Sequence, residues 1–344
     1  MMKILLTAEV NEELAKELDD IAEVTHEGWG RIQEILSEEE MIRFGEDKDI
    51  IITSYDPITK NVIDHCPNLK LVICTRANPV NVDAEYCKEK GILVSYAPGR
   101  NSDCTAEYTV ALMLSITRMI PMAYMALKNG QHCADAPYQK EIPSGLRRDI
   151  TWALGKGTPY VEFKGFQMHG HNLGVIGYGS IGRRVAELCK AFGMNILVYD
   201  PFLDASKVPS DVTLMSLDEL LANADIVTVH CKDTPETENL INAETLKKMK
   251  KTAYLINTSR GALVDEEALV HALLTHEIAG AAVDVYQIEP IARNHPFITQ
   301  CDNIVITPHL AGATYDAIDN HTVWLVEDVK HFLKGEPMER LYNV

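Results

Sequence analysis

The sequence lacks long hydrophobic runs, paired cysteines and a secretion signal, and each absence narrows what it encodes. No stretch approaches the roughly 20 apolar residues that a membrane-spanning helix needs. The eight cysteines are scattered and include no C-x-x-C pair, which favours reduced thiols over a disulfide scaffold. The start, MMKILLTAEVNEEL, has too short an apolar run for a secretion signal. We therefore expect a soluble, cytoplasmic protein, and we expect no metal site.

The sequence also contains few basic residues relative to acidic ones. The 344 residues include 32 Lys and Arg against 50 Asp and Glu, a formal net charge of −18. This balance repels nucleic acids and anionic membranes, and no Lys/Arg-rich run offsets it locally. Small anionic substrates remain compatible with it, because a binding site needs only one or two local cations. The length exceeds what one hydrophobic core usually supports, so we expect two domains.

What the sequence does contain is an alternation of short β-rich runs and helical patterns, which is typical of parallel sheets covered by helices. Strands are predicted in a first series at residues 3–7, 50–53, 69–75 and 92–97, and in a second series at residues 172–177, 195–200, 225–230, 253–257, 279–285 and 303–308. Between the series we expect a long helix over residues 101–130, ended or kinked near Pro121, and then a loop over residues 131–165. The last helix, over residues 314–335, should stop at Gly335.

A glycine-rich motif opens the second series. Gly177, Gly179 and Gly182 form G-x-G-x-x-G between a predicted strand and a predicted helix, and Asp200 ends the next strand. The glycines allow a backbone to approach a pyrophosphate, and the helix N-terminus offers N–H donors. Asp200 is expected to accept the ribose hydroxyls of adenosine and to repel a 2′-phosphate. The motif therefore predicts NAD rather than NADP.

The chain resembles the D-isomer-specific 2-hydroxyacid dehydrogenases in seven segments, in the order and spacing of that family: PNLKLVICTRANPVNVD, GRNSDCTAEYTVALML, VIGYGSIGRRVA, TPETENLINAETLKKMK, LINTSRGALVDEEAL, AAVDVYQIEP and ITPHLAGAT. The resemblance implies two doubly wound α/β domains with parallel sheets and a cleft between them. Residues 1–102 and 312–344 would form a flavodoxin-like, discontinuous substrate-binding domain. Residues 103–311 would form a Rossmann NAD-binding domain, including the interdomain helix and the 131–165 loop, which are expected to form a homodimer interface.

The resemblance also implies a catalytic set of Arg260, Glu289 and His309. A bidentate guanidinium suits the carboxylate of a 2-oxo or 2-hydroxy acid. Histidine suits acid/base work near neutral pH, and a carboxylate beside it stabilises its protonated form. His309 would donate a proton to the keto oxygen as NADH delivers hydride to C2, and would remove it in the reverse direction. Arg260 would hold the carboxylate, and Glu289 would orient His309.

The same mapping implies the remaining contacts. The residues expected to line the NAD site are Gly177, Gly179, Ser180, Ile181, Gly182, Asp200, His230, Cys231, Thr237, Thr258, Ser259, Asp284, Gly312 and Thr105. Those expected to bind the substrate are Arg76, Ala77, Asn78, Arg260 and His309. Asp284 would contact the nicotinamide amide, and Thr105 would approach the nicotinamide from the interdomain helix. His230 is expected to form a wall of the adenosine pocket, and Cys231 has no neighbour that would activate a thiolate.

The predicted substrate loop departs from the family pattern. It contains Asn78 where many relatives have glycine, followed by Pro79. Asparagine tolerates a left-handed backbone, so the loop is expected to keep its turn, while Pro79 removes one N–H donor. Tyr55 and Asp56 lie where phosphate-binding relatives often place a cation. These residues favour a polar, unphosphorylated 2-hydroxy acid.

Two other functions remain open. Transcriptional corepressors on the same scaffold can keep the three catalytic residues, so an NAD(H)-sensing binding protein is one alternative. An NADP-linked reductase of glyoxylate or hydroxypyruvate is the other, and Asp200 disfavours it. Turnover of NADH with a panel of 2-oxo acids would separate these functions.

Overall fold

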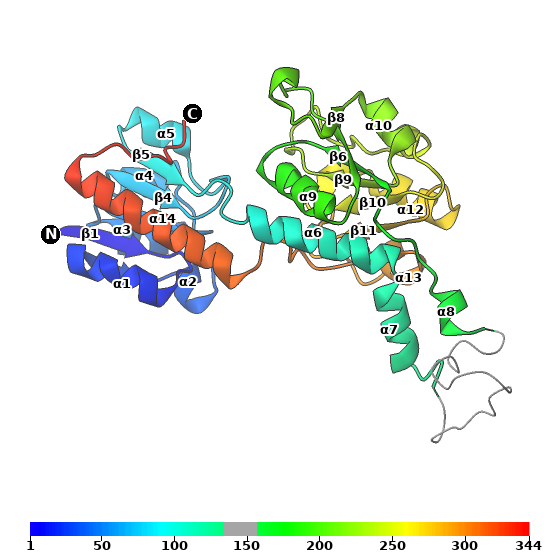
Figure 1. The fold of residues 1–344 in the computed structure, drawn as a ribbon. Helices are drawn as coiled ribbons and strands as arrows, with labels where there is room; N and C mark the ends of the chain where they lie inside the picture. Colours follow the sequence, from blue (N-terminus) through cyan, green and yellow to red (C-terminus); the bar gives the residue numbers. More distant parts are fainter. Residues whose placement is uncertain (134–156, 344) are drawn as a thin grey trace. The chain divides into compact units, whose positions relative to one another are not determined.

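The computed structural model describes residues 1–133 and 157–343, and the chain divides into two compact units (Figure 1). The terminal unit comprises Met1–Asn101 and Ala313–Val344, and the central unit comprises Ser102–Gly312. The chain therefore leaves the terminal unit and returns to it. Most of the predicted 131–165 loop, together with its expected part in a homodimer interface, lies outside the described residues.

The terminal unit contains a parallel sheet with the strand order β2-β1-β3-β4-β5, which is the flavodoxin-like order. Its strands are β1 (Met2–Leu6), β2 (Ala22–His26), β3 (Ile50–Thr53), β4 (Leu71–Cys74) and β5 (Leu93–Tyr96). All residues of β3 and β4 are buried, as expected for central strands of a parallel sheet that is covered on both faces. The first predicted series of strands is confirmed, with small shifts at the strand ends.

Helices α1 (Glu12–Ile21) and α14 (Tyr315–Lys334) lie side by side on the terminal unit (Figure 1). The unit also contains α2 (Trp29–Ile32), α3 (Glu38–Gly45), α4 (Lys60–Asp64) and α5 (Ala84–Glu89). The side chain of Thr314 caps the start of α14 by accepting a backbone N–H bond. Gly335 ends α14 with φ of 70°, a left-handed conformation that suits glycine, which confirms the predicted stop.

The central unit contains a parallel sheet with the strand order β12-β11-β10-β9-β6-β7-β8. Its strands are β6 (Asn172–Ile176), β7 (Asn195–Tyr199), β8 (Val212–Leu214), β9 (Ile226–Val229), β10 (Tyr254–Asn257), β11 (Gly280–Val283) and β12 (Ile304–Ile306). The order reverses at β6, as in the Rossmann fold, and the carboxyl ends of strands at such a reversal form a ligand site. The predicted fold class, two doubly wound parallel-sheet units, is confirmed.

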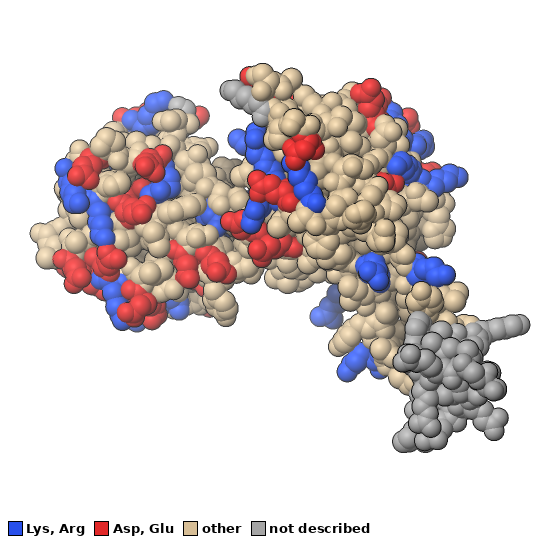
Figure 2. Space-filling model, viewed as in Figure 1, with Lys and Arg blue, Asp and Glu red and all other residues tan. Residues whose placement is uncertain are grey.

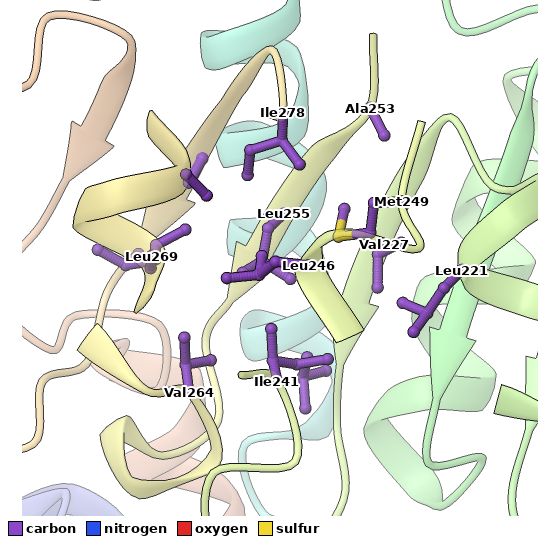
Figure 3. Close-up of a cluster of buried hydrophobic side chains, with 14 of the residues drawn as sticks. Leu221, Val227, Ile241, Leu246, Met249, Ala253, Leu255, Val264, Leu269 and Ile278 are labelled. Atoms are coloured by element: carbon purple, nitrogen blue, oxygen red, sulfur yellow. The ribbon is translucent and has the colours of Figure 1, made fainter. Parts of the chain in front are cut away.

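Both faces of this sheet are buried in hydrophobic cores. Leu255 belongs to one core cluster and Ile256 to the other, because successive side chains of a strand point to opposite faces. The Leu255 face is covered by α10 (Leu217–Asn223), α11 (Ala243–Leu246) and α12 (Glu266–Leu274). Figure 3 shows one side chain of each helix, Leu221, Leu246 and Leu269, in a cluster with strand and loop residues. The Ile256 face is covered by α6 (Ser102–Thr117) and α9 (Ser180–Ala191). Two short helices, α8 (Pro159–Glu162) and α13 (Pro296–Thr299), complete the unit.

Helix α6 and the following helix α7 (Ile120–Lys128) replace one long helix. They meet at a bend of 62°, where Met119 has φ of 53° and Pro121 lies in the first turn of α7. The kink predicted near Pro121 is therefore confirmed. Among the described residues, no single helix is long and apolar enough to cross a membrane, and only this bent pair reaches that length and composition together.

Two strands are absent from the predicted series, and both lie at sheet edges. β2 reads AEVTH and β8 reads VTL, and each has only one buried residue. Edge strands are not covered on all sides, so they need no unbroken apolar run.

The charged surface fits the composition, because basic and acidic side chains are interspersed on the described surface that Figure 2 shows.

Candidate active site

The turn after β10 presents Arg260. The side chain of Asn257 is buried and holds the turn, because its Nδ2 donates to the Arg260 carbonyl oxygen at 2.8 Å and its Oδ1 accepts the Ser259 N–H at 3.1 Å. Arg260 is exposed and donates from Nη1 to the Ser259 carbonyl oxygen at 2.7 Å. Within the described part of the chain, no carboxylate forms an ion pair with this guanidinium. The guanidinium is therefore available to an anionic ligand.

Gly261 allows a second loop to pack against this turn. A Cβ atom at Gly261 would lie 2.0 Å from the carbonyl carbon and oxygen of Tyr286, and 2.4 Å from the nitrogen of Gln287. Real Cβ atoms do not approach backbone atoms so closely, so the position requires glycine for space. The contact brings the loop that carries Glu289 next to the turn that carries Arg260.

Glu289 and His309 form a hydrogen-bonded pair. The Oε2 atom of Glu289 lies 2.6 Å from Nδ1 of His309, and Oε1 accepts the N–H of Tyr286 at 3.1 Å. The Glu289 side chain is 35% exposed and the His309 side chain 48%, so both can meet a ligand from solvent. A carboxylate on Nδ1 fixes the orientation of the imidazole and leaves Nε2 free to act.

The turn that carries His309 is held by Asp284. Asp284 is fully buried, and its Oδ1 accepts bonds from the Thr307 hydroxyl at 2.6 Å and the Leu310 N–H at 2.9 Å, while its Oδ2 accepts the Ala311 N–H at 2.8 Å. A buried carboxylate is costly unless its oxygens are bonded, and here both are. His309 has φ of 55°, a conformation that non-glycine residues rarely adopt. Asp284 therefore supports the backbone of His309, in addition to the nicotinamide contact predicted for it.

The three glycines of the motif meet different surroundings. Gly177 has φ of 89°, and a Cβ there would lie 2.6 Å from the nitrogen of Cys231; at Gly182 it would lie 2.1 Å from the Gly177 carbonyl oxygen. At Gly179, nothing lies within 4 Å of such an atom, and no side chain caps the helix α9 that Gly179 begins. Ser180 and Ile181 form the first turn of this helix. Open space beside an uncapped helix N-terminus fits a pyrophosphate.

Asp200 directly follows β7, beside the glycine-rich turn. Its Oδ2 accepts the N–H of Tyr178 at 2.8 Å, and its Oδ1 accepts the N–H of Phe202 at 3.0 Å. A carboxylate has about four lone-pair sites, so each oxygen can still accept a ligand hydroxyl. Asp200 therefore holds the turn and remains able to bind a ribose.

His230 and Cys231 follow β9 and lie against Gly177. Burial lowers the pKa of His230 to about 3, so its imidazole is neutral near pH 7. Burial, together with the charges of Asp200 and Asp233, raises the pKa of Cys231 to about 11, so its thiol stays protonated. These environments suit a pocket wall rather than acid/base or nucleophilic chemistry.

Threonines connect α6 with the turn after β10. The hydroxyl of Thr258 lies 2.7 Å from that of Thr109, which donates to the carbonyl oxygen of Thr105 at 2.7 Å. The hydroxyl of Thr105 is buried and has no hydrogen-bond partner in the described part of the chain. A buried polar atom without a partner is rare and fits one that a ligand completes. This observation supports the prediction that Thr105 faces a bound cofactor.

For three other residues predicted to line the NAD site, the structure gives less evidence of a ligand. Thr237 uses its hydroxyl within its own turn, donating to the Lys232 carbonyl oxygen at 2.6 Å and accepting the Thr234 N–H at 2.9 Å. Ser259 donates from Oγ to the Cys231 carbonyl oxygen at 3.1 Å. Gly312 is the last residue of the central unit.

The predicted substrate loop belongs to the terminal unit and follows β4. The guanidinium of Arg76 lies 4.9 Å from the ring centre of Tyr55, whereas Ala77 and Asn78 are exposed. Asn78 is not among the residues with positive φ, so the expected left-handed turn at this residue is wrong. Asn78 and Pro79 instead accept backbone bonds from Val80 and Val82, at 3.0 Å each, which form the turn without a left-handed residue.

Asp56 stabilises the structure of its own unit through hydrogen bonds. It is fully buried, its Oδ1 accepts the Leu36 N–H at 2.8 Å, and its Oδ2 accepts the Trp29 N–H at 3.3 Å. It therefore supports the 29–36 segment and does not face a ligand. Tyr55 forms an edge contact with Trp29 at 4.8 Å between ring centres, so an aromatic pair lies beside Arg76.

Residues that organise the site were not singled out by their sequence pattern. Thr109 contacts the turn after β10 through Thr258, which is distant in the sequence, and it resembles any buried helix residue. Asn257 gives a weak signal in the sequence, since it is a polar residue that ends an apolar strand three residues before Arg260.

In the ranges 1–133 and 157–343, no group of three or more His, Cys, Asp or Glu side chains could hold a metal ion.

The chain is similar to known proteins over most of its length. A family model described as the D-isomer specific 2-hydroxyacid dehydrogenase, NAD binding domain, matches residues 110–311. A D-3-phosphoglycerate dehydrogenase of Methanocaldococcus jannaschii is 35% identical over 100% of this chain, which spans 60% of that protein's length. A glyoxylate reductase of Thermofilum pendens is 38% identical over 89% of this chain and 85% of its own. A crystal structure of D-lactate dehydrogenase from Aquifex aeolicus, complexed with NAD and lactic acid, has a TM-score of 0.72 and 28% identity, covering 97% of this chain and 96% of its own.

Proposed function

Because this chain belongs to the family of D-isomer-specific 2-hydroxyacid dehydrogenases, we propose that it interconverts a small 2-oxo acid and the corresponding D-2-hydroxy acid with NAD as the hydride carrier. The 2.6 Å contact between Glu289 and His309, next to the Arg260 turn, carries this proposal. A carboxylate-bound imidazole suits proton transfer at a keto oxygen, and a guanidinium without an internal ion pair suits a substrate carboxylate.

Each of the three residues has one task. Protonated His309 donates from Nε2 to the keto oxygen, and neutral His309 removes the hydroxyl proton in the reverse direction. Glu289 keeps the imidazole oriented through Nδ1 and stabilises its positive charge. Arg260 holds the substrate carboxylate with two parallel N–H bonds. Bound NADH supplies the hydride that adds to C2.

The cofactor is proposed to bind at the carboxyl ends of β6, β7 and β9. The open space at Gly179 and the uncapped start of α9 would take the pyrophosphate, and the unpaired hydroxyl of Thr105 would meet the nicotinamide end. Asp200 would accept the adenosine ribose hydroxyls and repel a 2′-phosphate, so NAD is proposed over NADP.

The substrate is proposed to carry one carboxylate and no phosphate. Of the residues predicted to bind it in the terminal unit, Arg76 is the cation, while Ala77 and Asn78 are neutral. Asp56, which lies where phosphate-binding relatives often place a cation, is buried in its own hydrogen bonds. A phosphorylated substrate adds about two negative charges, which call for additional cations.

We also propose a homodimer that forms through α7 and α8. These helices expose large apolar side chains, namely Ile120, Tyr124, Met125, Leu127, Tyr160 and Val161. Apolar surface of this extent usually marks a protein interface. Sedimentation of the wild type and of Tyr124→Asp tests this, with a dimer and a monomer expected, respectively. A wild-type monomer at micromolar concentration would contradict it.

The proposed activity is tested by following NADH consumption with a panel of 2-oxo acids, with and without a phosphate group. The wild type should turn over an unphosphorylated acid, and Arg260→Ala and His309→Ala should not. Tight NADH binding without turnover of any acid would contradict the proposal and favour a dinucleotide-sensing protein.

A further inference from the structure

We propose that Glu266 and His295 form a second carboxylate–histidine pair, which positions Glu289 without touching the substrate. Both are therefore positioning residues. This inference rests on the proposed function, because Glu289 acts there by orienting His309. Its physical basis lies in five hydrogen bonds around the loop that joins β11 to α13.

Glu266 connects the Arg260 turn with the Glu289 loop. It begins α12, a few residues after Arg260, and its Oε1 accepts the N–H of Gln287 at 2.6 Å. Its Oε2 lies 3.2 Å from Nε2 of His295. The side chains of Glu266 and His295 are only 15% and 20% exposed, so water competes little for the bond between them. Glu266 therefore holds the loop on both sides of Glu289, at Gln287 and at His295.

The second bond of His295 fixes its tautomer. Its Nδ1 accepts the N–H of Phe297 at 3.2 Å and thereby caps α13. An N–H group only donates, so Nδ1 carries no proton and the neutral ring has its proton on Nε2. That proton faces the Glu266 carboxylate. Both ring nitrogens are thus engaged, and the ring cannot rotate without losing a bond.

The first part of the loop, at Tyr286, is bonded to the Glu289–His309 pair and its turn. Tyr286 donates its N–H to Glu289 at 3.1 Å and its hydroxyl to the Thr307 carbonyl oxygen at 2.9 Å, two residues before His309. Burial raises the pKa of Tyr286 to about 12, so this hydroxyl remains a donor. A shift of residues 286–287 would therefore move Glu289 relative to His309. Small displacements of this kind lower catalytic rates strongly.

Glu267 supplies a matched control. It lies beside Glu266 in the first turn of α12 and is exposed, and its side chain has no hydrogen bond or ion pair to any described residue. If Glu266 served only to place negative charge at a helix N-terminus, the two positions would behave alike. A difference between them isolates the contacts to Gln287 and His295.

Two substitutions remove the pair with little change in shape. In Glu266→Gln, the side chain faces two N–H donors with one acceptor oxygen and an NH2 group, so one donor loses its partner. In His295→Asn, the side chain can still cap α13 but is too short to reach Glu266. Each variant should lower kcat about tenfold, with KM and the Kd for NADH within twofold of wild type, because Arg260 and the glycine-rich turn are unchanged.

The double variant tests whether the residues act through one contact. We expect Glu266→Gln with His295→Asn to lose no more than about threefold beyond either single variant, and Glu267→Gln to stay within twofold of wild type. Wild-type kcat in Glu266→Gln, multiplied losses in the double variant, or a parallel loss of Tm and NADH affinity would overturn the inference.

A second measurement does not depend on activity. Hydrogen–deuterium exchange of the 286–291 segment should speed up about tenfold in Glu266→Gln and remain unchanged in Glu267→Gln, because Glu266 protects the Gln287 amide. Absence of wild-type turnover with every 2-oxo acid would overturn the proposed function, while this exchange pattern would still establish the contact. Unchanged exchange in Glu266→Gln would overturn the contact itself.

Discussion

Nδ1 of His309 lies 2.6 Å from Oε2 of Glu289, although the two residues come from different loops, one after β11 and one after β12. His309 holds this position with φ of 55°, a conformation that costs a non-glycine residue about 1–3 kcal/mol. The bonds around Asp284 stabilise that turn. We interpret the local strain as the cost of orienting an acid/base group.

Replacing His309 should abolish proton transfer and spare cofactor binding. His309→Gln is expected to lower kcat about 10²–10⁴-fold, because general acid catalysis usually contributes that much. The Kd for NADH should stay within threefold, since no bond of His309 reaches the glycine-rich turn. Steady-state kinetics and NADH fluorescence titration measure the two effects.

Glu289→Gln tests the same hydrogen-bonded pair with a milder change. It keeps the shape of the pair but removes the charge that stabilises a protonated imidazole. At the same pH, kcat for reduction of the 2-oxo acid should therefore fall more than kcat for oxidation of the 2-hydroxy acid. Equal kinetics in Glu289→Gln and wild type would contradict the role assigned to this pair.

Replacing Arg260 should weaken substrate binding. Arg260→Lys keeps the charge but loses the two parallel N–H bonds, so KM for the 2-oxo acid should rise about tenfold to a hundredfold. The Kd for NADH should not change. An unchanged KM in Arg260→Lys would show that the guanidinium does not hold the carboxylate.

Much of this site follows from local sequence, and the rest does not. Arg260, Glu289 and His309 stand in short motifs, and the glycine-rich turn follows from its place between a strand and a helix. Asn257 bonds within its own turn, to Arg260 and Ser259, but the bonds of Asp284 depend on a loop that only the folded chain brings to it. Gly261 is needed for close packing against Tyr286, which no local pattern reveals.

The fold likewise contains elements that the local sequence predicts and elements that it does not. The buried strands have apolar runs that mark them, whereas β2 and β8 are partly exposed edge strands without such a run. The bend between α6 and α7 follows from Pro121, because proline disfavours a continuous helix. The left-handed turn expected at Asn78 is wrong because the bonds to Val80 and Val82 form the turn in another way.

Two neighbouring glycines should separate cofactor binding from folding. Gly179→Val fills open space but places a poor N-cap residue before α9, so unfolding free energy should fall by no more than about 1 kcal/mol while NADH affinity falls more than about tenfold. Gly182→Ala places a Cβ 2.1 Å from the Gly177 carbonyl oxygen and should destabilise the fold by about 1–3 kcal/mol. Denaturant unfolding and NADH titration of both variants check this. Full NADH affinity in Gly179→Val would contradict the pyrophosphate site.

Asp200 should control the choice of dinucleotide. Asp200→Asn keeps an acceptor for the Tyr178 N–H and removes the charge that would repel a 2′-phosphate. The ratio of kcat/KM for NADH to that for NADPH should fall at least about tenfold. A wild-type preference for NADPH would contradict the assignment of Asp200.

His321 should make the terminal unit sensitive to acid. Burial lowers its pKa to about 4, and it bonds to the Glu9 carbonyl oxygen and the Arg100 guanidinium. Between pH 6.5 and about 4 the unfolded chain binds a proton here and the folded chain does not, so stability falls as pH falls through that window, by roughly 3 kcal/mol in total.

His321→Gln removes this titration. Its unfolding free energy should therefore decline less than that of the wild type between pH 6.5 and pH 4, while the two proteins show similar slopes above pH 7. Parallel pH profiles over the whole range would refute the contribution of His321.

The central claim is that this chain transfers hydride to C2 of a 2-oxo acid with His309 as the proton donor. The most direct measurement uses NADH deuterated at the transferred position and analyses the product by mass spectrometry and chiral separation. We predict one deuterium at C2 of the D-2-hydroxy acid with wild type, and no such product above background with His309→Gln. Tight NADH binding without deuterium transfer to any 2-oxo acid, or transfer that persists in His309→Gln, would contradict the claim.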